Sequence, residues 1–263
     1  MFERLIRASS LVLVLASAGC VRPSESSGFY GSLDKKDTQT TRRLAEVSQD
    51  EWALSRERLA SVRAAQPERP YVERVRLSIF DPRTRKRYEA RGAVAVSPDR
   101  AARMILIGPA GTTALDVWVT KDQFRFSVPA LHYEKRGGSD PDEAVGLPVG
   151  MLRWWFLSPL GGRLLLGRST ASETAWLLRD GDATMTVRTD GMNFVAIRRA
   201  GGYLEGIEWR GRGVSPEAGA RGLYLEGKFG LRVEVFVEEI LPDAPEAGAF
   251  EDPTRVEDKG REL

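Results

Sequence analysis

The protein has 263 residues, with 39 Lys and Arg against 37 Asp and Glu, so its formal net charge at pH 7 is only +2. This balance lacks the basic excess that nucleic-acid-binding proteins use, and we expect no nucleic-acid partner. Cys20 is the only cysteine, which excludes an internal disulfide. The length indicates one large domain with tails attached to it.

The first twenty residues have the pattern of a secretory signal. Arg4 and Arg7 give a basic start, and residues 8–19 are uncharged. This stretch is too short to cross a bilayer, which takes about 20 apolar residues, and it ends in small residues, as signal-peptide cleavage sites do. Because Cys20 follows directly, the segment resembles the lipobox of bacterial lipoproteins, in which the Cys is acylated and becomes the new N-terminus. The lipobox prefers Leu where this chain has Ser17.

The signal therefore predicts where the protein is held. We expect residues 1–19 to be a cleaved signal peptide and Cys20 to carry a lipid that anchors the protein to a membrane. Acylation would also explain a lone thiol in an oxidising compartment. An ordinary signal peptide followed by a chance Cys is the alternative. Val21 comes next, whereas Asp there resembles an inner-membrane retention signal, so we expect the outer membrane.

A tether, a helix and a long series of strands are predicted after the anchor. Residues 20–36 are rich in Ser, Gly, Pro and charge, which indicates a flexible tether. Residues 38–65 contain no Gly or Pro and space their apolar residues helically. From residue 74 on, short runs of alternating residues are separated by turn signals, which is typical of an antiparallel meander. The expected strands cover residues 74–79, 87–96, 104–107, 114–120, 124–128, 163–166, 175–179, 184–189, 193–199, 203–210, 222–226 and 231–239.

The middle of the chain interrupts the strands. Residues 139–143 have the acidic start of a helix, and Arg153 is the only polar residue between 151 and 157. A helix this apolar must be buried or must cover an apolar surface. An antiparallel sheet of about ten to twelve strands tends to curl or close, and the helix can then cover its concave side. Residues 242–263 are charged and contain Pro, so we expect a disordered tail.

Three segments resemble, in the same order, the LolA/LolB family of lipoprotein carriers and receptors, and LolB most closely. They are RGAVAV at residues 91–96, IGPAGTTALDV at 107–117 and GLPVGMLRWW at 146–155. For residues 37–241, the resemblance implies a strongly curved, unclosed antiparallel β half-barrel with a helical lid. It also implies a cavity that takes lipoprotein acyl chains.

One loop departs from this resemblance. LolB exposes a Leu within its Pro-x-Gly loop, and that Leu helps to deliver cargo to the membrane. Here Ala110 stands between Pro109 and Gly111. An Ala buries several CH₂ groups less than a Leu, at about 0.8 kcal/mol each. The membrane-proximal loop is expected at these three residues, and Ala110 argues against insertion of cargo into the membrane.

Aromatic side chains are the candidates for lining the acyl-chain cavity. Ordinary core packing is the alternative for each of them, because alternate residues of a strand face opposite sides of the sheet. Trp118 illustrates this limit, since its neighbours Val117 and Val119 are also apolar. The cavity candidates are Trp118, Phe126, Trp154, Trp155 and Trp176.

No set of catalytic or metal-binding residues is visible in the sequence. His132 is the only histidine, the Gly-x-Ser-x-Gly nucleophile elbow is missing, and structural zinc sites need several Cys or His ligands. We therefore expect no enzyme, no metal and no cofactor. The Arg-rich residues 83–87 fit either contact with anionic lipid headgroups or a solvated hairpin.

Two functions follow from these observations. The first is an outer-membrane lipoprotein that binds the acyl chains of lipids or lipoproteins, with a role in lipoprotein localisation. The second is a structural or scaffolding envelope lipoprotein that keeps the fold, lacks lipid transfer and binds a protein partner. Ala110 favours the second.

Overall fold

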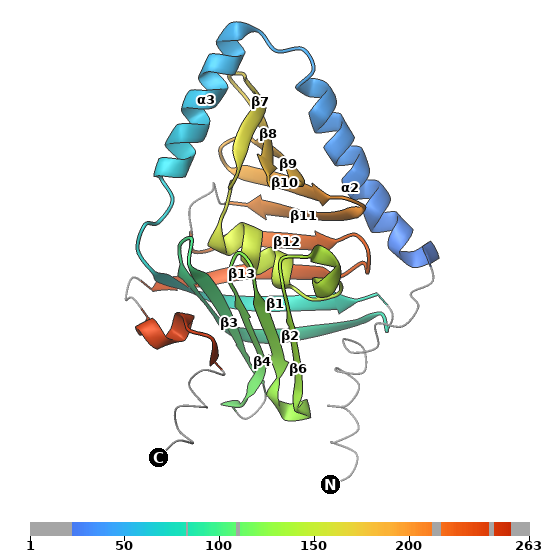
Figure 1. Ribbon diagram of the computed structural model, residues 1–263, viewed down its shortest axis with the longest axis vertical. Helices are drawn as coiled ribbons and strands as arrows, with labels where there is room; N and C mark the ends of the chain where they lie inside the picture. Colours follow the sequence, from blue (N-terminus) through green and yellow to red (C-terminus); the bar gives the residue numbers. More distant parts are fainter. Residues whose placement is uncertain (1–22, 83, 109–110, 212–216, 242–244, 254–263) are drawn as a thin grey trace.

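The computed structural model describes residues 23–82, 84–108, 111–211, 217–241 and 245–253. Two helices come first, α2 (Pro23–Arg43) and α3 (Gln49–Ala64). Short helical turns lie further along the chain, η2 (Pro129–Leu131), η3 (Pro141–Ala144), η4 (Met151–Leu157) and η5 (Ala247–Phe250). In Figure 1 the helices descend from one apex along either side of the sheet. The strands are β1 (Tyr71–Asp81), β2 (Lys86–Ser97), β3 (Ala101–Ile107), β4 (Thr113–Val119), β5 (Phe124–Val128), β6 (Tyr133–Gly137), β7 (Arg163–Ser169), β8 (Thr174–Asp180), β9 (Ala183–Thr189), β10 (Asn193–Ala200), β11 (Tyr203–Arg210), β12 (Arg221–Glu226) and β13 (Arg232–Leu241).

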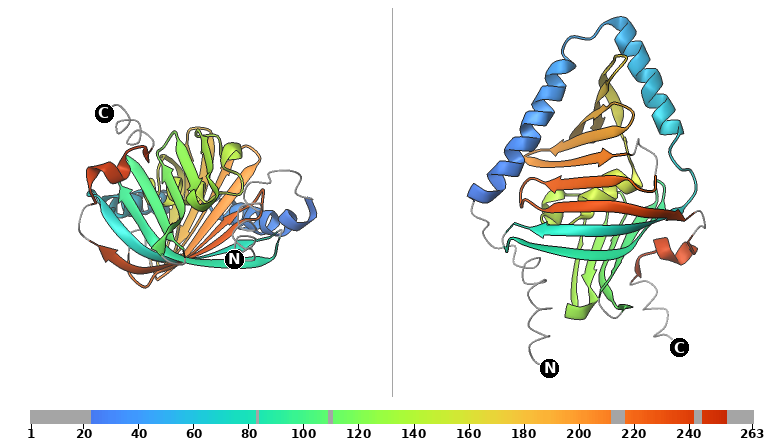
Figure 2. Two further views of the ribbon diagram at one scale, coloured as in Figure 1. Left: turned by 90° about the horizontal axis from the view of Figure 1, so that it is seen from below. Right: turned by 180° about the vertical axis from the view of Figure 1, so that it is seen from behind.

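The described strands form a single antiparallel sheet of 13 strands that does not close. Its order is β6-β5-β4-β3-β2-β1-β13-β12-β11-β10-β9-β8-β7, so two meanders join where the first strand pairs with the last. The sheet curves strongly from the β6 edge to the β7 edge (Figure 2). The predicted curved and unclosed antiparallel half-barrel with a helical lid is confirmed.

The chain segment between the two edge strands crosses the concave side of the sheet. It contains η3 (Pro141–Ala144) and η4 (Met151–Leu157), a π-helical turn in which every residue except Arg153 is buried. Trp155 lies 4.7 Å from Phe194 of β10 and 5.6 Å from Trp209 of β11, measured between ring centroids. The apolar helix predicted for residues 151–157 thus fills the middle of the half-barrel, whereas the helix start at 139–143 is only a single 3₁₀ turn.

Helices α2 and α3 lie on opposite faces of the sheet. Strand β10 alternates, with Phe194 in the main core and Ile197 in a separate cluster with Leu33 of α2. Helix α2 therefore covers the convex face of β9 to β12. Helix α3 packs on β7 and β8 and contributes Leu59 to the main core, and Trp176 Nε1 donates to the Ser55 carbonyl 2.9 Å away. Helix α3 is consequently the lid over the concave face.

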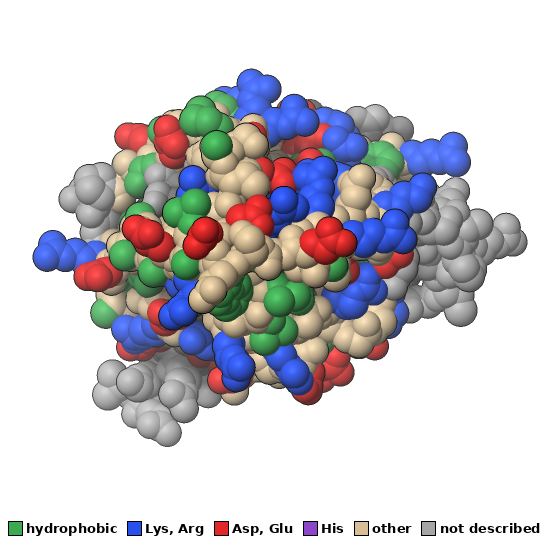
Figure 3. Space-filling view, turned by 90° about the horizontal axis from the view of Figure 1, so that it is seen from above, with side chains coloured by type: hydrophobic (Ala, Val, Ile, Leu, Met, Phe, Trp, Pro, Cys, Tyr) green, Lys and Arg blue, Asp and Glu red, His purple; other side chains and the backbone are tan. Residues whose placement is uncertain are grey.

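The single helix expected at residues 38–65 is wrong, because the chain turns between the two helices. Ser48 begins α3 with a capping box, in which its hydroxyl accepts from the Glu51 N–H at 3.2 Å and Glu51 Oε2 accepts from the Ser48 N–H at 3.1 Å. Arg43 pairs with Glu173 of the β7–β8 turn at 2.7 Å. The chain therefore rounds the sheet edge here, and the surface around this junction mixes basic, acidic and small groups of hydrophobic side chains (Figure 3).

Both expected tails differ from the structure in part. Helix α2 begins at Pro23, inside the segment 20–36 expected to be a flexible tether. In the expected tail, η5 (Ala247–Phe250) packs on the convex side of the sheet, where Trp118 Nε1 donates to the Phe250 carbonyl at 3.1 Å. Arg136 also pairs with Asp252 at 2.9 Å. Paired polar groups therefore hold a segment whose composition alone suggests disorder.

Strand β6 is the one strand that the sequence pattern missed. It contains Tyr133, three consecutive charged residues and Gly137, so it lacks the apolar alternation of a half-buried strand. Its position at the sheet edge explains this composition, because charged side chains discourage further strand pairing there. No helix in the described residues is long and apolar enough to span a bilayer.

Candidate ligand cavity

A cavity of about 1080 Å³ lies on the concave side of the sheet, beside η4. It is bounded by the end of α3, by residues 139–162 and by strands β8 to β11. This volume is slightly above the roughly 300–1,000 Å³ of small-molecule sites. The lid and the half-barrel thus leave space for a ligand.

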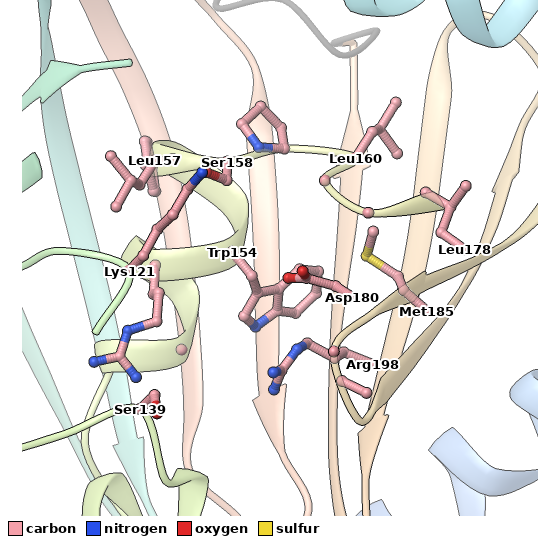
Figure 4. Close-up of a pocket in the computed structure, with 18 of the residues that line it drawn as sticks. Lys121, Ser139, Trp154, Leu157, Ser158, Leu160, Leu178, Asp180, Met185 and Arg198 are labelled. Atoms are coloured by element: carbon pink, nitrogen blue, oxygen red, sulfur yellow. The ribbon is translucent and has the colours of Figure 1, made fainter. Parts of the chain in front are cut away.

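One part of the cavity wall is apolar. Leu178 and Met185 project from the sheet, and Leu160 comes from the loop after η4 (Figure 4). Tyr71 and Phe156 complete this wall. Each of these residues is nine-tenths or more buried, so the cavity continues the main core instead of forming a separate surface groove. Such a wall suits hydrocarbon, whose transfer out of water is favourable.

Arg63 of α3 holds the loop that forms the cavity rim. Its guanidinium donates to the Leu160 carbonyl at 2.8 and 3.1 Å and to the Gly162 carbonyl at 2.6 Å. Leu160 has a φ of 57°, in the left-handed region that a non-glycine residue seldom adopts. Backbone strain of this kind persists only where the surroundings enforce it. The lid helix and the rim loop therefore form one unit.

The inner end of the cavity contains an ion pair between a buried carboxylate and a partly exposed guanidinium. Arg198 Nη1 lies 3.2 Å from Glu205 Oε1, and the Tyr224 hydroxyl donates to Glu205 Oε2 at 2.7 Å. Burial and the nearby Glu205 raise the pKa of Tyr224 well above its usual 10. Gly150 makes room for this group, since a Cβ there would lie 2.0 Å from Glu205 Oε2. These close contacts fix the carboxylate and the guanidinium in place.

A second buried carboxyl lies beside this pair. Glu226 is fully buried, and its oxygens accept the backbone N–H groups of Lys228 at 2.6 Å and Phe229 at 2.9 Å. Burial raises the pKa of Glu226 to about 7, although these hydrogen bonds oppose the shift. Glu226 therefore keeps its proton to a higher pH than a solvated carboxyl does.

Two further polar groups line the cavity, Arg153 and Trp154. Arg153 donates to the carbonyls of Thr120 at 3.0 Å and Gly138 at 2.8 Å, and burial lowers the pKa of its guanidinium. The indole Nε1 of Trp154 is buried and has no hydrogen-bond partner among the described residues. Figure 4 shows this nitrogen turned toward the guanidinium of Arg198.

The predicted aromatic residues separate into three groups. Trp154 lines the cavity. Phe126, Trp155 and Trp176 belong to the main core and are not among the residues that line the cavity. Trp118 lies on the opposite face of β4 from Val117 and is covered by η5. The structure therefore does not bring the five candidates together.

The membrane-related predictions fall mostly outside the described residues. Cys20, Pro109 and Ala110 are among these undescribed positions. Gly111 has a φ of 76° in the β3–β4 connection, where the Gly108 N–H donates to the Thr112 carbonyl at 2.8 Å. Of the three residues of the expected loop, only Gly111 is described, and the loop stays a prediction.

Sequence reasoning missed the polar residues of the cavity. Phe194, Ala196 and Arg198 alternate along β10, and Tyr203 and Glu205 alternate along β11. This period of two could have placed Arg198 and Glu205 on the core face. Within the described residues, no group of three or more His, Cys, Asp and Glu side chains could hold a metal ion.

No protein-family model matches the chain, and no curated protein matches it. Among solved structures, a LolA superfamily protein from Nitrosomonas europaea is similar over 76% of this chain and 98% of its own, with a TM-score of 0.50 and 14% identity. A putative outer membrane lipoprotein-sorting protein domain from Vibrio parahaemolyticus has a TM-score of 0.44 and 11% identity, covering 75% of this chain and 96% of its own. A DUF1329 family protein from Desulfovibrio piger has a TM-score of 0.48 and 9% identity. The similarity covers 78% of this chain and 98% of its own.

The fold and the first of these comparisons define a class, the curved and unclosed antiparallel half-barrels with a helical lid. Within that class, the chain has a LolA/LolB-like fold. The resemblance that the short sequence segments suggested is thereby supported at the level of the fold.

Proposed function

We propose that this protein is an outer-membrane lipoprotein, anchored through a lipid on Cys20, that binds the acyl chains of lipids or lipoproteins. The single observation that carries the proposal is the cavity of about 1080 Å³ between the lid helix and the concave face. Its apolar wall offers hydrocarbon a dry surface, with a gain of about 0.8 kcal/mol for each CH₂ buried. A role in lipoprotein localisation agrees with the similarity to a LolA superfamily protein.

A structural or scaffolding role in the envelope is the second candidate. The stacked rings of Trp155 and Trp209 and the nearby Phe194 occupy the middle of the half-barrel. Because these side chains fill the centre, the cavity lies only at one side of η4. The free volume is therefore smaller than the half-barrel would enclose without them. A protein that keeps this fold and binds an envelope protein would need no larger cavity.

Uptake of a fluorescent fatty acid distinguishes the two candidates. The test uses the full chain with Cys20→Ser, which cannot be acylated, together with mass spectrometry of the lipids that copurify. A Met185→Trp variant fills the cavity from β9, and it should lose most of the uptake. Met192→Trp is the matched control, because Met192 is 67% exposed and lies outside the cavity.

Acyl-chain binding is supported if copurified lipids and uptake are present and only Met185→Trp reduces them. Absence of both lipids and uptake would reject it, and capture of a reproducible envelope protein would then support the scaffolding role. The anchor is tested separately. The protein with its native Cys20 should sediment with outer membranes, whereas the Cys20→Ser variant should be released from them.

A further inference from the structure

Two hydrogen-bond donors meet at the inner end of the cavity without an acceptor between them. The buried Trp154 Nε1 has no partner in the described part of the chain. The described residues offer Arg198 one acceptor, Glu205, although a guanidinium carries five N–H groups. Both residues line the cavity, and the indole nitrogen points toward the guanidinium (Figure 4). A buried donor without an acceptor costs free energy, so the site is incomplete without a hydrogen-bond acceptor.

The carboxylate at this inner end is already committed. Glu205 is the one buried carboxylate among the described residues that line the cavity, and it accepts hydrogen bonds from Arg198 and Tyr224. Arg153 lies near charges of both signs, Glu205, Arg198, Asp122 and Glu143. The guanidinium of Arg198 therefore keeps N–H groups that a ligand oxygen can accept.

The remaining carboxylates that line the cavity are at its mouth. Each of them is exposed, so water screens its charge. They are Glu68, Asp99, Asp122, Asp140, Asp180 and Asp182. The cavity therefore combines a solvated acidic mouth, an apolar wall and an inner end where Arg198 and Trp154 present N–H donors.

We propose that the inner end binds the carboxylate that terminates a free fatty acid, between Trp154 Nε1 and the guanidinium of Arg198. The chain itself lies along Leu160, Leu178 and Met185. This inference rests on the proposed acyl-chain binding and restricts its substrate class. Lipids with a free anionic group are preferred over chains whose carbonyl is an ester or an amide, because those linkages carry no charge.

Competition between an acid and its ester tests the preference. The full chain with Cys20→Ser is loaded with a fluorescent fatty acid at about pH 8, where a carboxylic acid is ionised. Laurate, methyl laurate and acetate are then added separately. Charge-assisted hydrogen bonds are worth enough that laurate should displace the probe at roughly tenfold lower concentration than its ester. Acetate, which lacks the chain, should displace little.

Variants assign the preference to named residues. Trp154→Phe keeps an aromatic ring and removes the N–H, and Arg198→Gln combined with Glu205→Gln removes the ion pair without leaving one charge buried. In both variants, laurate and methyl laurate should displace the probe at similar concentrations. Arg199→Gln is the matched control, because Arg199 is the next residue and pairs with Asp34 and Asp37 outside the cavity. It should keep the preference.

The outcomes separate the two proposals. Equal displacement by laurate and methyl laurate would overturn the oxyanion site and leave acyl-chain binding intact. Displacement by acetate as strong as that by laurate would overturn the link between the anion and the chain. Failure of the probe itself to bind would overturn the proposed function together with this inference. Loss of the preference in Arg199→Gln would show that net charge, not the site, causes it.

Discussion

Arg198 and Arg199 are adjacent in β10 but form ion pairs on opposite faces of the sheet. Arg198 lies 3.2 Å from Glu205 inside the half-barrel, and Arg199 lies 2.6 Å from Asp34 and 2.9 Å from Asp37 of α2 outside it. The Glu205 side chain is 2% exposed, whereas that of Asp34 is 47% exposed. The same change of charge therefore has different consequences at the two positions.

Replacing these arginines singly should show this difference in stability. Arg198→Ala leaves Glu205 buried without its cation, which typically costs about 3–5 kcal/mol. Arg199→Ala breaks a partly exposed pair, for which about 0–1 kcal/mol is typical. Urea unfolding measures the loss of stability in each variant as a lower midpoint concentration of urea, with the slope of the free energy against urea unchanged. Equal losses in the two variants would contradict the placement of Glu205 in a desolvated site.

The buried carboxyl of Glu226 should make stability depend on pH. Its pKa is raised from 4.5 to about 7 by burial, so between these values the folded protein binds a proton that the unfolded chain has released. The free energy of unfolding therefore falls as pH rises through this window. At about 1.4 kcal/mol per pKa unit, the loss from this group is about 3 kcal/mol.

Urea unfolding from about pH 5 to pH 8 checks this prediction, with Glu226→Gln as the comparison because an amide does not titrate in this range. The variant should lose part of the hydrogen bonding to Lys228 and Phe229 at every pH, and its stability should vary less with pH. Curves that run parallel for the two proteins would show that Glu226 does not titrate in this range.

The contact between α3 and β7 depends on the absence of a side chain at Gly167. A Cβ there would lie 2.3 Å from Ser55 Oγ and 3.0 Å from Ser55 Cβ. Gly167→Ala should therefore push the lid helix away from the sheet and cost about 1–3 kcal/mol, as overpacking does. Ser55→Ala in the same chain removes the closer contact and should restore part of the loss. A Gly167→Ala protein as stable as the parent would refute this docking.

The segment around η5 should be held less tightly on the sheet when Trp118 loses its indole N–H donor. Trp118→Phe removes the hydrogen bond to the Phe250 carbonyl, and an unpaired buried carbonyl costs about 1–3 kcal/mol. Hydrogen exchange of residues 247–252 should become faster, because local opening then costs less. Exchange within α3 is the internal control and should not change. Unchanged protection of residues 247–252 would mean that the pair between Arg136 and Asp252 holds this segment by itself.

The sequence predicted the strands well because their side chains alternate. Strand β13 has Val233, Val235 and Val237 buried in alternation with partly exposed residues, and this period identifies a strand wherever one face is buried. Strand β6 lacks the signal because it lies at an edge. Helix α2 was missed between residues 23 and 37 because its composition is that of a linker, and packing on the sheet decides its state.

The cavity was predicted only in part, for a related reason. Aromatic residues could be recognised as core candidates, but only the pairing of strands decides which of them face the free space. Trp118 and Trp176 are both buried tryptophans on strands, yet the first faces η5 and the second faces α3. Burial thus follows from residue type, whereas the side of the sheet depends on register.

By itself, the sequence predicted an antiparallel meander that curls or closes and a buried helix that covers its concave side, because local patterns of polarity carry that information. The unclosed half-barrel came from the resemblance of three short segments, and the anchor at Cys20 stays a prediction. Only the tertiary structure decided that α2 and α3 lie on opposite faces and that Arg198, Glu205 and Trp154 meet in one cavity. Arg198 and Glu205 come from paired strands, and Trp154 comes from the segment that crosses between the two sheet edges. No local pattern encodes their approach, since it results from the curvature of the whole sheet.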